Sequence, residues 1–334
     1  MSPAGLAVLE PGHHLDGIQP PMSFLLNRLL SIVLTLLLIS AITFAVTNIL
    51  PGDVAMMIMG TQSNPEALAG LRQSLGLNDP LIVQYGNWIW GMLTGNWGTS
   101  LIFKVPITTL LSQKAAASAM LVVLSMLIAL IVAVPLGVWA AVHRNKWQDT
   151  ASSTGALLGV SLPDFYWGIM LILLFARVLG WFPSSGFADP FENFGNALRY
   201  AFLPSLALGL GLMAHLTRMT RATMVGILGQ EFIRVARAKG LSERTVVWRY
   251  GLANAIGPVM TIAGLQIGYL FGSIIVIDTL FNYTGMGWLT YQALLNRDVP
   301  LIQATVFLIA AVVMLTNLAV DLLYTLVDPR IRLG

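Results

Sequence analysis

Long uncharged apolar runs separated by shorter polar segments give this chain its pattern. Six runs are candidates for membrane-spanning helices: residues 29–50, 115–142, 151–176, 200–217, 251–277 and 300–320. The first run holds 22 residues without a charge, enough for a helix to cross the ~30 Å hydrocarbon core of a bilayer. The pattern therefore predicts an all-α, polytopic membrane protein with six transmembrane helices.

The polar segments divide the chain into a tail and one membrane domain. Residues 1–21 are polar and rich in Pro and Gly, which predicts a disordered N-terminal tail. Residues 22–334 form the membrane domain, whose longest polar segments are 51–114 and 218–258. Both of these loops are expected to contain short helices of their own.

The 51–114 loop carries helix signals and several aromatic residues. Asn64-Pro65 is a typical helix start and Gly76 a typical stop, so a helix is predicted between them. Four aromatic side chains are expected either at the membrane surface or packed against neighbouring helices: Tyr85, Trp88, Trp90 and Trp97.

Composition agrees with the membrane class, and charge placement predicts the orientation. The chain is 56% hydrophobic and only 10% charged, and it has no cysteine for a disulfide, a thiol nucleophile or a cysteine metal site. If both termini lie inside, the inner segments hold 12 of the 18 Lys and Arg residues, in agreement with the positive-inside rule. Both termini and the 218–258 loop are therefore expected in the cytoplasm, and the 51–114 loop outside.

The 218–258 loop holds 7 of the 18 basic residues and predicts a helix, a tight turn and a second helix. The first helix has an apolar face and a wetter face, with Phe232, Val235 and Ala236 on the former and Glu231, Arg234 and Arg237 on the latter. Gly240 can end this helix in a left-handed conformation, and Ser242 followed by Glu243 can start the next. A DNA-binding helix-turn-helix is one alternative, which the flanking spans disfavour, and an ordinary basic cytoplasmic loop is another.

This loop also resembles the cytoplasmic coupling loop of binding-protein-dependent ABC importer permeases. The resemblance is to the dipeptide, oligopeptide and nickel group, in the string Ala236-Arg237-Ala238-Lys239-Gly240-Leu241 followed by Asn254 and Pro258. Further similarities lie at 76–80, 95–100, 285–287 and 328–332, so the resemblance covers nearly everything after Met22. It implies the type I ABC importer permease fold in the plasma (inner) membrane of a prokaryote.

The resemblance also implies a function and a set of partners. The expected function is a transmembrane permease subunit of an ATP-driven ABC importer, which translocates di- or oligopeptides delivered by an external substrate-binding protein. The expected partners are the lipid bilayer, that binding protein, a second permease subunit and two ATPase subunits or domains, but no nucleic acid. ATP and Mg would bind to the ATPase partners, and no cofactor is expected in this chain. Nickel or another small solute is the alternative cargo.

In this family the coupling loop docks its helix into a groove on the ATPase subunit. The resemblance assigns that role to Glu231, Phe232, Arg234, Val235, Ala236, Arg237, Ala238, Lys239, Gly240 and Leu241. Phe232, Val235 and Leu241 would enter an apolar groove, and the basic residues would pair with acids of the groove. The alternative for the basic residues is topology alone, with positive charge retained inside.

Enzymatic chemistry has little support in the sequence. The chain has no G-x-x-x-x-G-K-[ST] loop for a nucleotide and no H-E-x-x-H motif, so neither ATP hydrolysis by a phosphate-binding loop nor a catalytic metal site is expected. A membrane-embedded enzyme is therefore disfavoured. An ion-coupled secondary transporter is the remaining alternative, and it would usually carry several intramembrane acids or inverted repeats.

Asp164 is the acid that interrupts an apolar run, and charge inside a membrane is expensive. It follows Pro163, which interrupts helical hydrogen bonding, so Asp164 would either cap the renewed helix or face the substrate pathway and meet a cationic group. Small residues in the fifth run recur every four positions at Gly264, Gly268 and Gly272. They permit close packing, either within the chain or against a partner permease.

Overall fold

The computed structural model describes residues 21–49, 54–59, 64–74 and 76–327. Across these residues the secondary structure is helical apart from one isolated bridge between Thr99 and Pro106. The helices are α1 (Pro21–Ile49), α2 (Val54–Met59), α3 (Pro65–Ser74), α4 (Leu81–Leu93), α5 (Ile107–Val142), α6 (Trp147–Ser161), α7 (Asp164–Leu171), α8 (Phe194–Leu228), α9 (Glu231–Ala238), α10 (Glu243–Thr245), α11 (Ala253–Leu280), α12 (Met286–Leu295) and α13 (Val299–Val327). Two π-helical segments, Ile172–Val178 and Val246–Leu252, continue α7 and join α10 to α11. The predicted tail and the 328–332 motif lie outside the described residues, except for Pro21.

Five described helices are long and apolar enough to cross a membrane, which agrees with five of the six predicted spans. They are Leu26–Ile49 of α1, α5, α8, the continuous helix Glu243–Leu280 and Val299–Leu322 of α13. Several exceed their predicted ranges, since helical hydrogen bonding continues past the last apolar residue while hydropathy marks only the part within the hydrocarbon. The short helix predicted after Asn64 is confirmed as α3, and Gly76 has a positive φ of 67°.

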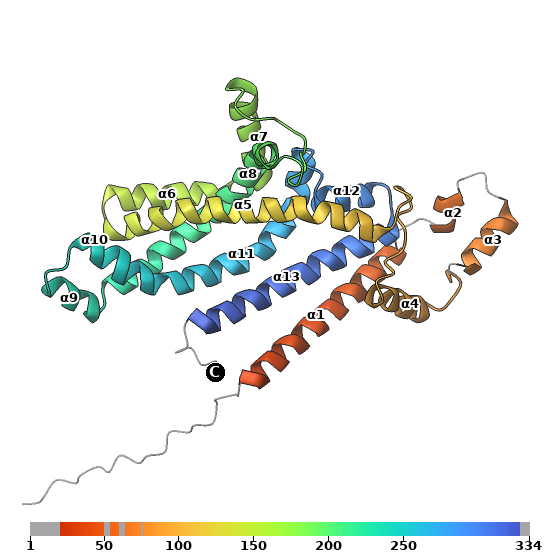
Figure 1. Cartoon of the computed structure of the whole chain (residues 1–334), viewed down its shortest axis with the longest axis horizontal. Coiled ribbons are helices and arrows are strands. Elements are labelled where there is room, and N and C mark those ends of the chain that lie inside the picture. Colours follow the sequence, from red (N-terminus) through yellow and green to blue (C-terminus); the bar gives the residue numbers. More distant parts are fainter. Residues whose placement is uncertain (1–20, 50–53, 60–63, 75, 328–334) are drawn as a thin grey trace, which may run out of the picture.

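The third predicted span differs from the expectation of one helix over 151–176. It consists of α6 followed by α7, which is bent by 101° relative to α6. The bend has a local cause, because a residue before proline is driven out of the helical region, and Leu162 is extended with φ −103° and ψ 134°. Figure 1 shows α7 turning away from the long helices beside it. Six spans result only if this bent pair is counted as one.

Closely packed helices α5, α8 and α11 form the core. Their buried residues include Leu121 of α5, Leu208 and Leu212 of α8, and Leu270 and Ile274 of α11. A glycine allows α5 and α8 to pack closely, because a Cβ added to Gly137 on α5 would lie 2.5 Å from Thr220 Cβ and 2.8 Å from the Thr217 carbonyl oxygen on α8.

The glycine stripe of α11 serves packing within the chain at two of its three positions. A Cβ on Gly264 would lie 2.3 Å from a Val320 methyl group of α13, and one on Gly268 would lie 3.3 Å from Val313 of the same helix. Gly272 has no such neighbour within 4 Å. The stripe therefore brings α11 against α13, and only its last member is left for another role.

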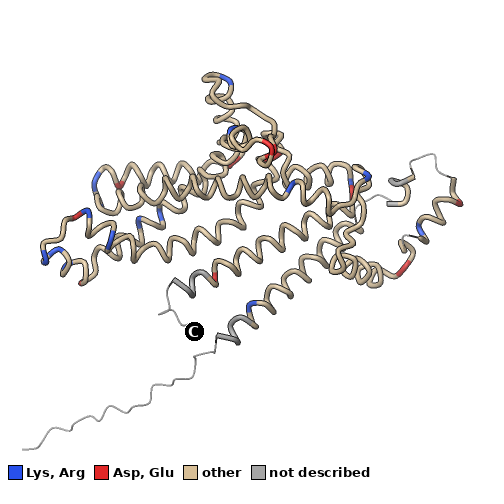
Figure 2. The backbone as a smooth tube through the Cα atoms, viewed as in Figure 1, with Lys and Arg blue, Asp and Glu red and all other residues tan. Residues whose placement is uncertain are grey.

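The two ends of the molecule carry different elements. In Figure 1, α9 and α10 lie at the same end as the beginning of α1 and the end of α13, while α12 and α2–α4 lie at the opposite end. Figure 2 shows several Lys and Arg residues at the α9 end, with long uncharged stretches of helix between the two ends.

Aromatic side chains pack against one another at the end opposite α9. Tyr85, Trp88 and Trp97 make ring contacts with Phe44 of α1 or Phe307 of α13, so these three side chains pack against neighbouring helices. Trp90, in contrast, is largely exposed.

Two buried aspartates at this same end accept hydrogen bonds from other segments of the chain. Asp298 Oδ2 accepts hydrogen bonds from Ser100 Oγ at 2.5 Å and from the Ile102 backbone N–H at 3.2 Å. Asp278 Oδ2 accepts from the backbone N–H groups of Gly287 and Trp288 at the start of α12, at 3.0 and 3.2 Å. Both carboxylates are fully buried and join segments that are separate in the sequence.

Candidate coupling surface and pathway residue

The predicted helix–turn–helix is present at α9 and α10. Helix α9 begins at Glu231, directly after Gly229 and Gln230, and its last turn is closed by the Gly240 backbone N–H, which donates to the Arg237 carbonyl at 2.9 Å. Gly240 has φ +73°, the left-handed conformation expected of a residue just past a helix end. Ser242 then caps α10, since its hydroxyl accepts from the Thr245 backbone N–H.

One face of α9 packs inside the chain. Ile233 is fully buried and Ala236 is 5% exposed, and both belong to one apolar cluster with Val246, against which Leu228 packs. The Ala236 methyl group therefore belongs to the internal face of α9, although the sequence pattern placed it beside Phe232 and Val235. The pattern also missed Ile233, because the inner face of so short a helix is set by the segment that folds back over it, which periodicity does not reveal.

The surface of α9 next to this buried face, together with the turn that follows, exposes large apolar side chains. Phe232 is 38% exposed, Val235 is 46% exposed, and Leu241, just after the turn, is 37% exposed. Phe232 and Val235 are three residues apart and so are neighbours on the helix surface. Ala238, Lys239 and Gly240 are exposed as well, so the turn itself is accessible in the isolated chain.

Two basic residues of α9 already have carboxylate partners within the chain. Arg237 donates from Nη2 and Nε to the two carboxylate oxygens of Glu243, at 2.6 and 3.1 Å, so the ion pair bridges the turn around Gly240. This hydrogen bonding raises the pKa of Arg237 above its ordinary value. Arg234 lies 3.2 Å from Glu231, and both side chains are largely exposed. Arg237 thus helps to shape the turn, and Arg234 stays accessible.

Asp164 lies where three helices meet. It is the first residue of α7, directly after the bend, and is 9% exposed. Tyr269 of α11 donates a hydrogen bond from its hydroxyl to Asp164 Oδ2 at 3.0 Å, and a Cβ on Gly211 of α8 would lie 2.9 Å from Oδ1. The N-cap position belongs to Pro163, and no side chain caps this helix start, but a carboxylate in a first helical turn is still favoured by the helix dipole. Tyr269 was missed in the sequence; its only signal was a hydroxyl in the middle of an apolar run.

Metal-binding geometry is lacking in the part of the chain that the structure describes. No group of three or more His, Asp or Glu residues lies close enough there to hold a metal ion. The functional candidates therefore reduce to the exposed side of α9 with its turn and to the Asp164–Tyr269 contact.

Comparisons with known proteins agree with this arrangement. Residues 133–333 match the family described as the binding-protein-dependent transport system inner membrane component, and residues 21–104 match the N-terminal membrane component of such systems. The glutathione transport system permease protein GsiC of Escherichia coli strain K12 is 38% identical over 311 residues, which cover 93% of this chain and 99% of that protein. GsiC of Salmonella typhi gives the same identity and coverage. Among solved structures, a chain of the inward-facing MetNI methionine ABC transporter aligns with a TM-score of 0.55 and 18% identity, over 66% of this chain and 97% of its own length, a likeness of fold alone.

Proposed function

Because the chain belongs to the family of binding-protein-dependent transport system inner membrane components, we propose that it forms part of the translocation pathway for short peptides in an ATP-driven importer. The chain is a membrane-spanning permease subunit of an ABC importer, similar to GsiC over almost its full length. The relatives are named for glutathione, a tripeptide, and this is the single observation that carries the proposed cargo class.

The importer needs ATP hydrolysis, which we propose that partner subunits supply. We place two ATPase subunits or domains at the α9 end, a second permease subunit alongside the chain, and a substrate-binding protein at the opposite end. ATP and Mg would bind in the ATPase partners. The α9 end would be cytoplasmic, in agreement with its basic residues and the positive-inside rule.

The exposed side of α9 is the proposed contact with the ATPase. Phe232, Val235 and Leu241 offer apolar surface that stays exposed among the residues that the structure describes. Nucleotide shifts an equilibrium only through different affinities for its two states, so ATP would act by closing the ATPase pair and moving α9 as a rigid body. Arg237 would act within the chain by holding the turn, whereas Arg234 and Lys239 would face acids of the groove.

Cysteine cross-linking tests this contact directly, because the chain has no cysteine of its own. A Val235→Cys variant is expected to cross-link to a cysteine introduced in the groove of the ATPase, in the assembled complex. Phe194→Cys is the control, since Phe194 is 65% exposed, more than Val235, but lies at the start of α8, the end away from α9. Equal cross-linking of both positions, or none at Val235, would contradict the docking role.

The cargo is tested by uptake into proteoliposomes that contain the complete complex and its binding protein. Glutathione and dialanine are expected to accumulate only with ATP, and Ni²⁺ is expected not to compete. Uptake that follows an ion gradient without ATP would indicate a secondary transporter instead. ATP-dependent uptake of Ni²⁺ but of neither peptide would leave the importer in place and overturn the cargo.

Asp164 is proposed to meet the cationic amino group of a peptide in the pathway. Its carboxylate is partly desolvated and held by a single side-chain hydrogen bond from Tyr269, so one oxygen remains for a cation. Asp164→Asn is expected to slow uptake of dialanine more than uptake of N-acetyl-dialanine, which lacks the charge. Tyr269→Phe removes only the hydrogen bond and should preserve the preference for the cationic peptide. Unchanged selectivity in Asp164→Asn would leave helix stabilisation as its role.

A further inference from the structure

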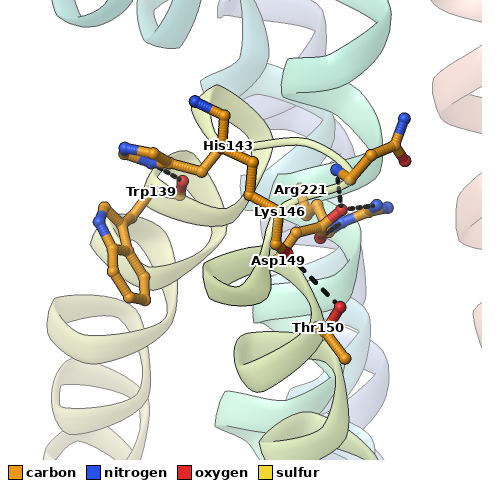
Figure 3. A network of polar contacts seen from close by, with 7 residues as sticks. Trp139, His143, Lys146, Asp149, Thr150 and Arg221 are labelled. Carbon is orange, nitrogen blue, oxygen red and sulfur yellow. Dashed lines mark hydrogen bonds and ion pairs between the residues drawn. The ribbon is translucent and has the colours of Figure 1, made fainter.

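The turn between α5 and α6 is closed by an aspartate that also reaches a third helix. Helix α5 ends at Val142 and α6 begins at Trp147. Asn145 in the turn has φ +64°, and its backbone N–H donates to Asp149 Oδ2 at 3.0 Å. Figure 3 shows Asp149 projecting from the first turn of α6 toward α8. Asp149 is only 5% exposed, although it lies at the end of the helix.

Arg221 of α8 holds this aspartate through two hydrogen bonds. Its Nη2 donates to Asp149 Oδ2 at 2.7 Å and its Nε donates to Oδ1 (Figure 3). Such a paired arrangement fixes the relative orientation of both side chains, because the guanidinium and carboxylate planes must align. The Arg221 side chain is 30% exposed, so its removal leaves the buried carboxylate of Asp149 as the charge without compensation. The contact joins residues 72 positions apart in the sequence.

Few other side chains are buried in the first half of α6, where Trp147 makes a ring contact with Trp139 of α5. Asp149 and Ala156 are the only buried residues of α6, while Leu157 and Leu158 are more than half exposed. The tight packing of α6 on α8 comes further along, where a Cβ on Gly159 would lie 3.0 Å from Ala214 Cβ. Asp149 is therefore the one buried residue of α6 before Ala156, and its ion pair is a hydrogen-bonded contact that connects this first half of α6 to α8.

The helices on either side of this contact lead to the two candidate sites. Arg221 lies two turns before the end of α8, and only Gly229 and Gln230 separate that end from α9. In the other direction α6 runs to the bend at Pro163, after which Asp164 contacts Tyr269. A displacement of α9 thus enters α8 close to Arg221, and it reaches the bend from there along α6 as well as through the contact of Gly211 with Asp164.

We propose that Asp149 and Arg221 are a positioning pair that makes α6 move with α8, so that a displacement of α9 reaches the bend that carries Asp164. This role rests on the proposed docking of α9 to an ATPase. Without the pair, the start of α6 is free to lag behind α8, and the part of the motion that α6 carries is lost before it reaches the bend. Neither residue contacts substrate or nucleotide in this mechanism.

Distance measurements between spin labels test the pair in the complete complex, without knowledge of the cargo. Ala151→Cys on α6 and Ala222→Cys on α8 are at exposed positions near the pair and provide the labels in a chain that has no native cysteine. With the native pair, the distance distribution is expected to be narrow and to stay unchanged between the nucleotide-free complex and the complex trapped with ATP and vanadate. Asp149→Asn is expected to broaden the distribution and to shift it on trapping, while Asp149→Glu restores the narrow one.

Arg221→Lys keeps the test decisive if Asp149→Asn fails to fold. It retains the charge but removes the two-pronged geometry, so broadening is expected here too. Lys146→Gln, in the same turn, removes a nearby charge without touching the pair and should leave the distribution narrow. The dependence of ATP hydrolysis on binding protein should weaken roughly 2- to 30-fold in Asp149→Asn, the range typical of coupling residues. If the pair were merely structural, Asp149→Asn would instead lower the amount of assembled complex. In the complex that does assemble, ATP hydrolysis would depend on binding protein as it does in the native complex.

A second label pair separates failure of this inference from failure of the proposed docking. Gln230→Cys directly before α9 and Leu295→Cys at the end of α12 are at exposed positions, and they report whether ATP moves α9 relative to the opposite end of the molecule. If that distance does not change on trapping, the proposed coupling through α9 is wrong. If it changes while the α6–α8 distance stays narrow in both Asp149→Asn and Arg221→Lys, only the role of the positioning pair is overturned.

Discussion

Replacing Gly240 isolates the energetic contribution of one backbone conformation to ATPase docking. Gly240 has φ +73°, and a Cβ added there would meet no atom within 4 Å. A methyl group there therefore meets no steric clash with the residues that the structure describes, and the main effect of a substitution is the strain of a left-handed residue. That strain is about 1–2 kcal/mol for an ordinary L-residue, less for Asn and more for a β-branched residue.

The size of the effect on binding follows from where the strain is released. In the free permease the exposed turn can relax to another conformation, whereas docking requires the turn that joins α9 to α10. Docking must then restore the strained conformation, and its free-energy cost raises the dissociation constant by about 5- to 30-fold for Gly240→Ala. Because the cause is backbone conformation, the loss of affinity should be smallest for Gly240→Asn, larger for Gly240→Ala and largest for Gly240→Val. It should not follow side-chain size.

The assay is the dissociation constant of the detergent-solubilised permease for its ATPase subunits, with circular dichroism to confirm equal helix content. Gly226→Ala is the control, since Gly226 is an exposed glycine of α8 that also has no neighbour within 4 Å of its added Cβ but lies inside a helix. It should bind as the native protein does. Equal affinities for Gly240→Asn and Gly240→Val, or a matching loss in Gly226→Ala, would refute the reasoning.

Three further outcomes are expected from the same contacts. Gly137→Ala should lower the free energy of unfolding by about 1–3 kcal/mol, because its Cβ would lie 2.5 Å from an α8 side chain, and thermal unfolding in detergent should show a drop that Gly226→Ala lacks. Asp298→Ala should cost about 1–3 kcal/mol by leaving the Ser100 hydroxyl and a backbone N–H without their acceptor, and faster limited proteolysis between residues 95 and 106 would reveal it. Arg237→Gln should change stability by less than about 1 kcal/mol, since its ion pair is exposed and screened by salt; a larger loss that persists in 1 M salt would contradict this.

Local physics explains what the sequence revealed about the coupling region. A left-handed residue after a helix favours glycine whatever lies around it, so the turn at Gly240 was predictable from its neighbours in the chain alone. The cap at Ser242 is equally local. The face of α9 that packs inward was not predictable, because Ile233 and Ala236 are buried by Val246, which returns to them only after the turn.

The pathway and positioning residues show the same division. Asp164 was visible as an acid in an apolar run, but its partner Tyr269 is 105 positions away, and nothing in the spacing connects the two. Asp149 and Arg221 are each typical of polar residues near predicted helix ends, and only the packing of α6 beside α8 makes them a partly buried ion pair. The 101° bend at Pro163 also belongs here: proline predicts a break, but the angle depends on what α7 packs against.

By itself, then, the sequence determined where the chain can cross a membrane, where its helices stop and which loop offers an exposed basic helix, because length, hydropathy and backbone preference act within a few residues. Tertiary structure alone decided which faces are inside, which distant side chains meet and how the third span is bent. These depend on contacts between segments tens to hundreds of residues apart, whose energies appear only when the helices are packed together.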